Sequence, residues 1–173
     1  MMNLVLVGFM GTGKTTVGAA LAASLEMKHT DLDDAIVESE GRSIPEIFTA
    51  QGEAYFRDVE TKRLAQLLAV GSQVITTGGG AVLRKQNVEM MMEQGIVIAL
   101  HATEEELIKR LENDTGRPLL AGGVATRVKT LMAERAGVYD FAPIQVDTTE
   151  KSLSDIVVEI TTQVVERTQD GEQ

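Results

Sequence analysis

The sequence predicts an α/β fold in which a parallel β-sheet carries helices on both faces. Apolar runs of strand length alternate with segments of helical period, the pattern of parallel strands joined by helical crossovers. The length of 173 residues and the apolar fraction of 43% suit one domain with a substantial core. No repeat, low-complexity run or linker interrupts the alternation. We therefore expect a single domain over 1–173, with a frayed polar tail at 168–173.

The expected strands are short runs rich in apolar and β-branched residues. In chain order they are Asn3 to Val7, a short strand just before Asp31, Gln73 to Thr77, Ile96 to Leu100 and Ile144 to Asp147. Open parallel sheets bind ligands at the carboxyl ends of their strands. The residues that follow each strand are therefore the first candidates for a functional site.

The expected helices carry apolar residues at helical spacing, as Val17 and Leu21 do in the first of them. Serine or threonine followed three residues later by glutamate predicts capping boxes at Ser43 and Thr103. The predicted helices are Lys14 to Leu25, Asp33 to Glu40, Ser43 to about Gly52, Ala54 to Ala69, Arg84 to Gln94, Thr103 to about Glu112, Val124 to Arg135 and Ser152 to Arg167.

The composition argues against several classes of function. Acidic residues outnumber basic ones by 26 to 16, and the formal charge of −10 would repel a nucleic acid. The absence of cysteine removes disulfides and thiolate chemistry. The longest strongly apolar stretches, Leu4 to Val7 and Ile96 to Leu100, are far shorter than the ~20 residues of a membrane span. With no signal-peptide pattern at the N-terminus, we expect a cytoplasmic protein that binds neither nucleic acid nor membrane.

A phosphate-binding loop (P-loop) follows the first expected strand. The segment Gly8 to Thr15, GFMGTGKT, matches G-x-x-x-x-G-K-[ST] in full between a strand and a helix, as the motif requires. Glycines let successive N–H groups point at phosphate, Lys14 can reach the β- and γ-phosphates, and the Thr15 hydroxyl can ligate Mg²⁺. The alternative is a glycine-rich turn with a chance Lys-Thr. We assign nucleotide binding to Gly11, Thr12, Gly13, Lys14, Thr15 and Thr16.

Two carboxylates, Asp31 and Asp33, lie where the second expected strand ends. Strand alternation would send both to the same side. One can orient a Mg²⁺-bound water there, and the other can take the proton of a substrate hydroxyl. The alternative for Asp33 or Asp34 is a helix N-cap. A neighbouring P-loop strengthens the functional interpretation, because phosphoryl transfer needs these groups in that place.

A glycine triplet, Gly78 to Gly80, follows the third clear strand. Three glycines leave backbone N–H groups accessible to a ligand that approaches closely. The alternative is a sharp loop that merely needs positive φ. Elsewhere, His29 and His101 are the only histidines and stand far apart, so we expect them in the core or at strand edges and not on a metal.

Taken together, these motifs resemble the shikimate kinase family. The match runs from residue 3 to about 165, with each element in the expected order and spacing. Many families share the P-loop, but not the combination. The resembling residues are Gly8 to Gly18, Asp31-Leu32-Asp33, Phe56-Arg57, Thr77 to Gly80, Arg117-Pro118-Leu119-Leu120, and Glu134-Arg135 with Tyr139.

The resemblance implies a three-layer α/β/α P-loop kinase fold whose five-stranded parallel sheet has the order 2-3-1-4-5, as in nucleoside monophosphate kinases. It also implies a reaction, transfer of the γ-phosphoryl group of ATP to the 3-hydroxyl of shikimate, with ATP and Mg²⁺ as cofactors. We expect a monomer whose partner is the small molecule alone.

The resemblance assigns roles to individual residues. Arg57 and Arg135 would grip the carboxylate of shikimate, because a planar guanidinium can bind a carboxylate bidentately. Asp33 and the Gly79 backbone would contact the ring hydroxyls, and Arg110 would stack on adenine. For catalysis the resemblance implies Lys14, Asp33 and Arg117, and for the metal it implies Thr15 and Asp31. The implied substrate-binding residues are Asp33, Arg57, Gly78, Gly79, Gly80 and Arg135. The nucleotide would be bound by Arg110 and Arg117 in addition to the P-loop.

The arginines also allow structural interpretations. Arg57 could pair with Glu60 or Glu53 at helical spacing. Arg135 could be a cation favoured at a helix C-terminus, and Arg110 could be an ordinary surface residue.

A lid is expected over about 112–123, where glycines at both ends supply hinges. Arg117 within it would meet the phosphates on closure and stabilise charge in transit. The segment Asn113 to Gly116 is less basic than in many members of the family, which weakens the case for further lid contacts but not for Arg117.

Three rival functions stay open. The first is a related kinase for gluconate or a nucleotide, and the second is a regulatory protein that binds ATP without acting on shikimate. The third is an ATPase or GTPase switch, although the base-reading Asn/Thr-Lys-x-Asp pattern of GTPases is absent.

Overall fold

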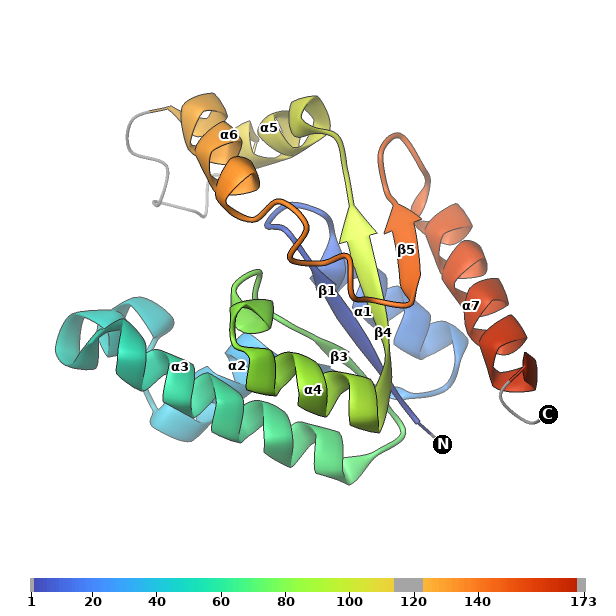
Figure 1. Cartoon of the computed structure of the whole chain (residues 1–173), viewed down its shortest axis with the longest axis horizontal. Helices are drawn as coiled ribbons and strands as arrows, with labels where there is room; N and C mark the ends of the chain where they lie inside the picture. The colour runs from blue at the N-terminus through green and yellow to red at the C-terminus, as the bar shows by residue number, and fades with distance from the viewer. Residues whose placement is uncertain (1, 114–122, 171–173) are drawn as a thin grey trace.

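The computed structural model of the protein describes residues 2–113 and 123–170. A five-stranded parallel sheet forms its centre, with the strand order β2-β3-β1-β4-β5 (Figure 1). The strands are β1 (Asn3–Gly8), β2 (Lys28–Asp31), β3 (Gln73–Thr76), β4 (Gly95–His101) and β5 (Ile144–Asp147). The predicted strands, their parallel pairing and the order 2-3-1-4-5 are confirmed.

The helices also follow the predicted pattern. They are α1 (Lys14–Ser24), α2 (Leu32–Glu40), α3 (Ile44–Val70), α4 (Lys85–Gln94), α5 (Glu104–Glu112), α6 (Val124–Glu134) and α7 (Leu153–Asp170), with a short 3₁₀ helix, η1 (Ala81–Leu83), after the glycine triplet. Most ends differ from the prediction by a single residue. Helix α7, however, continues to Asp170, into the segment that we expected to fray.

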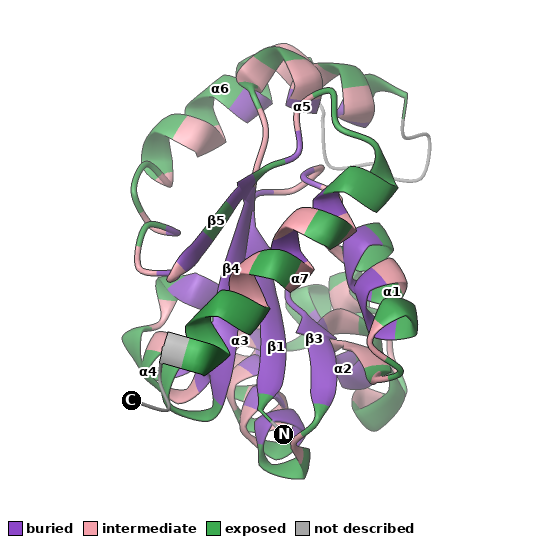
Figure 2. Cartoon of the chain, turned by 90° about the vertical axis from the view of Figure 1, so that its right-hand side faces the viewer, coloured by how far each residue is buried: buried purple, intermediate pink, exposed green. Residues whose placement is uncertain are grey.

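The sheet separates two apolar layers. Every residue of β1 is buried, as expected for a strand that pairs on both sides (Figure 2). Leu4 and Leu6 pack into the cluster that holds the apolar residues of α1 and α7. Val5 and Val7 point the other way, into the cluster formed with α2 to α6. This alternation within one strand produces the predicted three-layer α/β/α architecture.

Helix α3 contains a sharp break. It begins with the predicted capping box, in which Ser43 N donates to Glu46 Oε2 at 2.7 Å and Glu46 N donates to Ser43 Oγ at 3.4 Å. At Gly52 the backbone leaves the helical region, with φ 83° and ψ 175°. The break separates the two helical pieces that the sequence predicts on either side of this glycine.

The second predicted capping box is only half formed. Thr103 Oγ1 accepts from Glu106 N at 3.3 Å, as predicted. The Glu106 carboxylate does not return to Thr103, because it pairs with Arg110 at 2.8 Å, and Thr103 N donates to Thr149 Oγ1 instead. An arginine within reach offers the carboxylate a stronger, charge-assisted partner than a backbone amide does.

The predicted lid falls largely on residues 114–122, so Arg117 lies outside the residues that the structure describes. Its two flanking helices, α5 and α6, lie side by side above the sheet (Figure 1). In the described part of the chain, no helix combines the length and the apolar character that a membrane crossing requires.

Candidate active site

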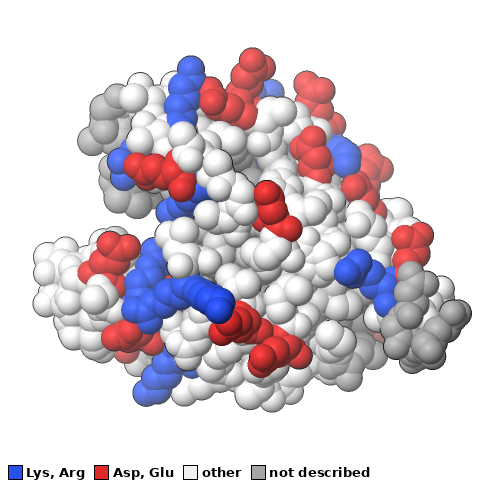
Figure 3. Space-filling view, in the orientation of Figure 1, with Lys and Arg blue, Asp and Glu red and all other residues white. Residues whose placement is uncertain are grey.

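The three sequence motifs meet at one edge of the sheet. Thr76 of β3 is in register with Leu6 of β1 on one side and with Asp31 of β2 on the other. The P-loop, the carboxylates and the glycine triplet, which follow these three strands, therefore lie together. Figure 3 shows a hollow on this side, between the lobe of α5 and α6 and the tip of α2 and α3, with basic side chains at its edge.

The backbone of the P-loop has a shape that requires glycine. Gly8 has φ 145°, and a Cβ on it would lie 2.4 Å from the carbonyl oxygen of Leu100 on β4. Gly11 and Gly13 also have positive φ, of 80° and 93°. Helix α1 begins at Lys14, directly after the loop, so the unpaired N–H groups of its first turn face the same space.

The P-loop side chains make hydrogen bonds within the loop itself. Lys14 Nζ donates to the carbonyl oxygen of Phe9 at 2.9 Å, so the long side chain folds back over the loop. Thr12 is buried, and its hydroxyl donates to the same oxygen at 2.8 Å. Thr15 and Thr16 are exposed on the first turn of α1. The side chains of Thr12 and Lys14 and the backbone N–H of Thr12 thus all converge on the carbonyl oxygen of Phe9 within the loop.

Thr15 and Asp31, the predicted metal ligands, are in contact. Thr15 Oγ1 donates to Asp31 Oδ2 at 3.2 Å. Both supply oxygen, the ligand type that Mg²⁺ prefers, and Mg²⁺ usually completes its shell with water and phosphate oxygens. Within residues 2–113 and 123–170, no cluster of three or more His, Cys, Asp or Glu side chains could hold a metal ion. The pair therefore fits Mg²⁺ that arrives with a nucleotide.

The two carboxylates come together for a reason other than the predicted one. Asp31 ends β2 and is itself the N-cap of α2, because its Oδ1 accepts from Asp33 N at 2.9 Å and from Asp34 N at 3.3 Å. Asp33 already belongs to the first helical turn. The expectation of strand alternation was thus wrong, as was the alternative that Asp33 or Asp34 is the cap. The cap itself brings Asp33 near Asp31.

Each glycine of the triplet faces one of the predicted substrate-binding side chains. A Cβ on Gly78 would lie 3.2 Å from Asp33 Oδ1, and one on Gly80 would lie 2.5 Å from Arg57 Nη2. A Cβ on Gly79 would lie 3.0 Å from Arg135 Nη1. None of the three has positive φ, so the loop needs glycine for space and not for its backbone conformation.

Arg57 makes both of the helix ion pairs that its sequence position allowed. Its Nη1 pairs with Glu60 at 2.7 Å, and its Nε lies 3.7 Å from Glu53. Its guanidinium also packs over the Phe56 ring, with Cζ 5.2 Å from the ring centroid. These contacts hold the guanidinium against Gly80, so the helix pairs serve to orient it.

Glu60 is a site residue that we did not assign from the sequence. Its side chain is only 1% exposed, and burial raises the pKa of its carboxyl, an effect that Arg57 opposes. In the sequence it is visible only as one of two possible helix partners of Arg57, because burial cannot be read from spacing alone.

Arg135 reaches the triplet from the opposite lobe. It caps the C-terminal end of α6, as its structural interpretation predicted, and its Cζ lies 5.8 Å from the centroid of the Phe9 ring. The buried Tyr139 donates its hydroxyl to the carbonyl oxygen of Gly79 at 2.8 Å. The residues after α6 are thereby tied to the loop that follows β3.

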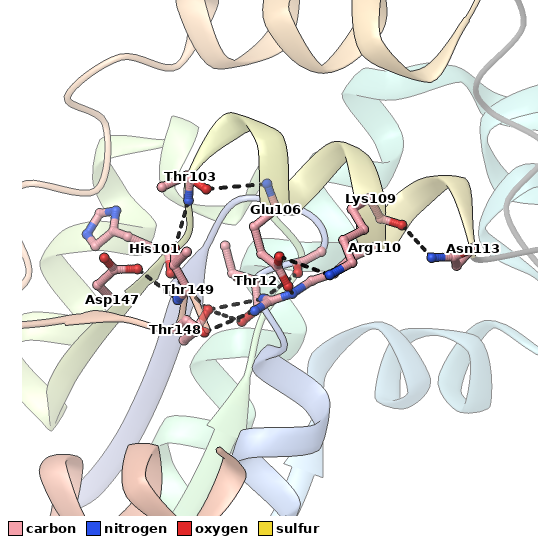
Figure 4. A network of polar contacts seen from close by, with 11 residues as sticks. Thr12, His101, Thr103, Glu106, Lys109, Arg110, Asn113, Asp147, Thr148 and Thr149 are labelled. Atoms are coloured by element: carbon pink, nitrogen blue, oxygen red, sulfur yellow. Dashed lines mark hydrogen bonds and ion pairs between the residues drawn. The ribbon is translucent and has the colours of Figure 1, made fainter. Parts of the chain in front are cut away.

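Arg110 links the P-loop to the turn after β5 (Figure 4). Its Nη1 donates to the Gly11 carbonyl oxygen at 3.1 Å, and its Nη2 donates to the Thr148 carbonyl oxygen at 3.0 Å. Its Nε pairs with Glu106 at 2.8 Å. Arg110 is thus not an ordinary surface arginine. The edge of the guanidinium is occupied, whereas the predicted stacking on adenine would use its face.

Asp33 has the most perturbed acidity in the site. Its pKa is raised from the ordinary 3.8 to about 6, mainly by burial, then by the negative charges of Asp31 and Glu60, and Lys14 opposes the rise. A carboxylate of this pKa is a better proton acceptor near neutral pH than an exposed aspartate. The geometry thus joins a phosphate loop, a pair of metal-type oxygens, two guanidinium groups and a basic carboxylate.

Comparison with known proteins is consistent with this geometry. A family model described as shikimate kinase matches residues 10–166. The shikimate kinase of Geobacter metallireducens is 45% identical over 160 residues, 92% of this chain and 89% of that protein. A solved shikimate kinase from Acinetobacter baumannii in complex with shikimate has a TM-score of 0.89 at 34% identity, covering 96% of this chain and 94% of that one. A gluconokinase from Sinorhizobium meliloti, 19% identical with a TM-score of 0.63 and coverages of 98% and 94%, shares the fold alone.

Proposed function

The chain belongs to the shikimate kinase family, and from that premise we infer that it transfers the γ-phosphoryl group of ATP to the 3-hydroxyl of shikimate. The products are shikimate 3-phosphate and ADP. The observation that carries the assignment is the convergence of Arg57, Arg135 and Asp33 on the glycine triplet. Two cations and one basic carboxylate on one loop suit an acceptor that carries both a carboxylate and a reactive hydroxyl.

The P-loop holds the donor end of the reaction. Backbone N–H groups from Gly11 to Lys14 bind the phosphates, and the Lys14 ammonium supplies positive charge where charge develops during transfer. Arg117 adds a second cation in this proposal when the lid closes. Its role stays a prediction from the sequence.

Thr15 and Asp31 hold Mg²⁺ in the proposed complex. The ion supplies charge neutralisation at the β- and γ-phosphates. Thr15 gives its hydroxyl proton to Asp31, so the lone pairs of its oxygen stay available for a metal. Asp31 is fixed by its role as the cap of α2.

Residues from α3 and from the end of α6 form the proposed binding site for the phosphoryl acceptor. Arg57 from α3 and Arg135 from the end of α6 bind the carboxylate of shikimate and fix the orientation of its ring. Asp33 accepts a hydrogen bond from the 3-hydroxyl and takes its proton as the phosphoryl group arrives.

All of these residues come from one chain, which supports a monomer as the working unit. We place the reaction in the cytoplasm, where ATP is available.

A coupled assay of ADP release tests the substrate. We expect release to require Mg²⁺ and to be strongly stimulated by shikimate, and only weakly by gluconate or by a nucleoside monophosphate. Equal stimulation by either of the other acceptors would overturn the assignment of shikimate. Release that is independent of any acceptor would instead indicate a plain ATPase.

A further inference from the structure

A line of hydrogen bonds runs from His29 to the proposed magnesium ligands. His29 Nε2 lies 3.1 Å from Thr76 Oγ1, and Thr76 Oγ1 donates to Asp31 Oδ2 at 2.7 Å. Thr15 donates to the same carboxylate oxygen. The proposed function uses Thr15 and Asp31 but gives no role to His29 or Thr76.

The chemistry of these groups sets the direction of each hydrogen bond. The Asp31 carboxylate only accepts, so the Thr76 hydroxyl gives its single proton to Asp31. Toward His29 the hydroxyl oxygen can then only accept. His29 therefore carries a proton on Nε2 and donates it to Thr76.

Packing against α1 restrains the middle of this line. Thr76 is fully buried, with 0% of its surface exposed, and His29 is half-buried on the edge strand β2. A Cβ on Gly18 would lie 2.3 Å from Thr76 Cγ2 and 3.1 Å from His29 Nε2. The backbone of α1, the helix that carries Thr15, thus lies directly against both side chains.

Asp31 has little freedom to turn once these contacts are made. Its Oδ1 accepts from Asp33 N and Asp34 N, and its Oδ2 accepts from the hydroxyls of Thr15 and Thr76. Of these four donors, Thr76 is the one whose hydroxyl direction depends on a further side chain. The hydrogen bond from His29 fixes the Thr76 hydroxyl from its other side and polarises its O–H bond toward the carboxylate.

We propose that His29 is a positioning residue for the magnesium site. By donating to Thr76 it keeps the Thr76 hydroxyl aimed at Asp31, and Asp31 Oδ2 is thereby held toward Thr15. The inference rests on the Mg²⁺–nucleotide part of the proposed function and is independent of the identity of the acceptor. Groups behind metal ligands commonly tune metal affinity in this way.

Isothermal titration calorimetry of ADP, with Mg²⁺ and with EDTA, tests the proposal without any turnover. The measured quantity is the factor by which Mg²⁺ tightens ADP binding. We expect His29→Leu to reduce this factor by about threefold to tenfold, less than the loss typical of direct partners of metal ligands. The affinity for ADP in EDTA should be unchanged. His29→Gln, which keeps a donor at the end of the side chain, should retain most of the factor.

Thr30→Val is the matched control. The Thr30 hydroxyl also bridges β2 to β3, donating its proton to Gln73 Oε1 at 2.8 Å and not to His29, Thr76 or Asp31. The factor should stay at the wild-type value in this variant. Should His29→Leu fail to fold, His29→Ala, which truncates a half-buried side chain, takes its place.

An unchanged factor in His29→Leu would overturn the proposal. So would an equal loss in Thr30→Val, because the effect would then report only the pairing of β2 with β3. A wild-type protein whose ADP affinity ignores Mg²⁺ would overturn the metal assignment itself, and this inference with it. Loss of shikimate specificity alone would affect only the acceptor assignment.

Discussion

Gly80 and Arg57 lie so close together that a side chain at the glycine would displace the arginine. A Cβ on Gly80 would be 2.5 Å from Arg57 Nη2 and 3.0 Å from its Cζ. The guanidinium cannot move away without breaking an ion pair, because its Nη1 pairs with the buried Glu60 at 2.7 Å. The orientation of the proposed carboxylate grip therefore depends on the loop after β3 as well as on α3.

Gly80→Ala should weaken the binding of shikimate and leave the binding of the nucleotide unchanged. We expect the KM for shikimate to rise about tenfold, the equivalent of about 1.4 kcal/mol, because the guanidinium is pushed from its position. Gly78→Ala, which faces Asp33, should act mainly on kcat. Steady-state kinetics and ADP titration measure both effects. A wild-type KM for shikimate in Gly80→Ala would contradict the proposal that Gly80 sets the orientation of Arg57.

Arg57→Ala and Asp33→Asn should fail in different ways. In the proposed complex Arg57 holds a group that does not react, so its removal should raise the KM for shikimate markedly, with some loss of turnover through misorientation of the ring. Asn at position 33 cannot take the proton, so kcat should fall. Arg42→Ala, which removes an arginine paired with Glu40, is the control and should change neither. Full kcat in Asp33→Asn together with a normal KM in Arg57→Ala would contradict both roles.

The pH dependence of kcat/KM should report Asp33. The carboxyl acts as a base only when ionised, and its pKa in the free protein is about 6. We expect kcat/KM to fall about tenfold for each pH unit well below 6 and to level off above 7. In Asp33→Asn this limb of the pH profile should disappear, leaving a lower kcat/KM that changes little with pH. A wild-type limb centred near the ordinary pKa of an aspartate would contradict this prediction.

Asp33→Asn should stabilise the folded protein above pH 6. A carboxyl whose pKa is raised from 3.8 to about 6 binds its proton more tightly in the folded state. Its contribution to folding is therefore fully present below pH 4 and is lost as the pH rises through 6. The rise corresponds to at most about 3 kcal/mol, so the variant should gain stability at pH 7.5 and little at pH 4. Urea denaturation at the two pH values checks the sign.

Lys14→Ala should lower turnover by a factor of about 10² to 10³, the loss expected when a group that stabilises developing charge is removed. Lys14 lies in the half-exposed P-loop, so the thermal midpoint should change by no more than a few degrees. Single-turnover measurements separate a loss of chemistry from a loss of ATP binding. Near-wild-type turnover would exclude the role given to this lysine.

The fold was predictable because its signals are local and repeated. Val5 and Val7 belong to a continuous apolar run, which indicates a strand buried on both faces, and Gly41 and Gly71 follow helices where the sequence predicts their ends. The sheet order came from the resemblance to a family, since alternation alone does not say which strands are neighbours. The last helix ends at Asp170 and not at the predicted Arg167, because polar composition does not by itself end a helix.

The site was less predictable where its parts depend on distant neighbours. The cap at Asp31 was missed because the sequence does not show at which of three nearby aspartates the strand gives way to the helix. The burial of Glu60 and the contact of His29 with Thr76 arise from packing between elements far apart in the chain. Spacing along one element carries no information about such contacts.

The break at Gly52 divides α3, the helix that carries Arg57 of the proposed acceptor site, into two units. Residues 44–51 precede it, and Arg57 follows it on the second unit. The first unit reaches the second through the Phe48 ring, 4.7 Å from the Phe56 ring that supports the guanidinium. The same segment places Ile47, which is fully buried, in the apolar cluster that holds Val7 of β1 and Phe9 of the P-loop. A change of tilt at Gly52 would therefore reach the acceptor arginine through Phe48 and the nucleotide loop through Ile47, so that one hinge couples the two halves of the proposed reaction.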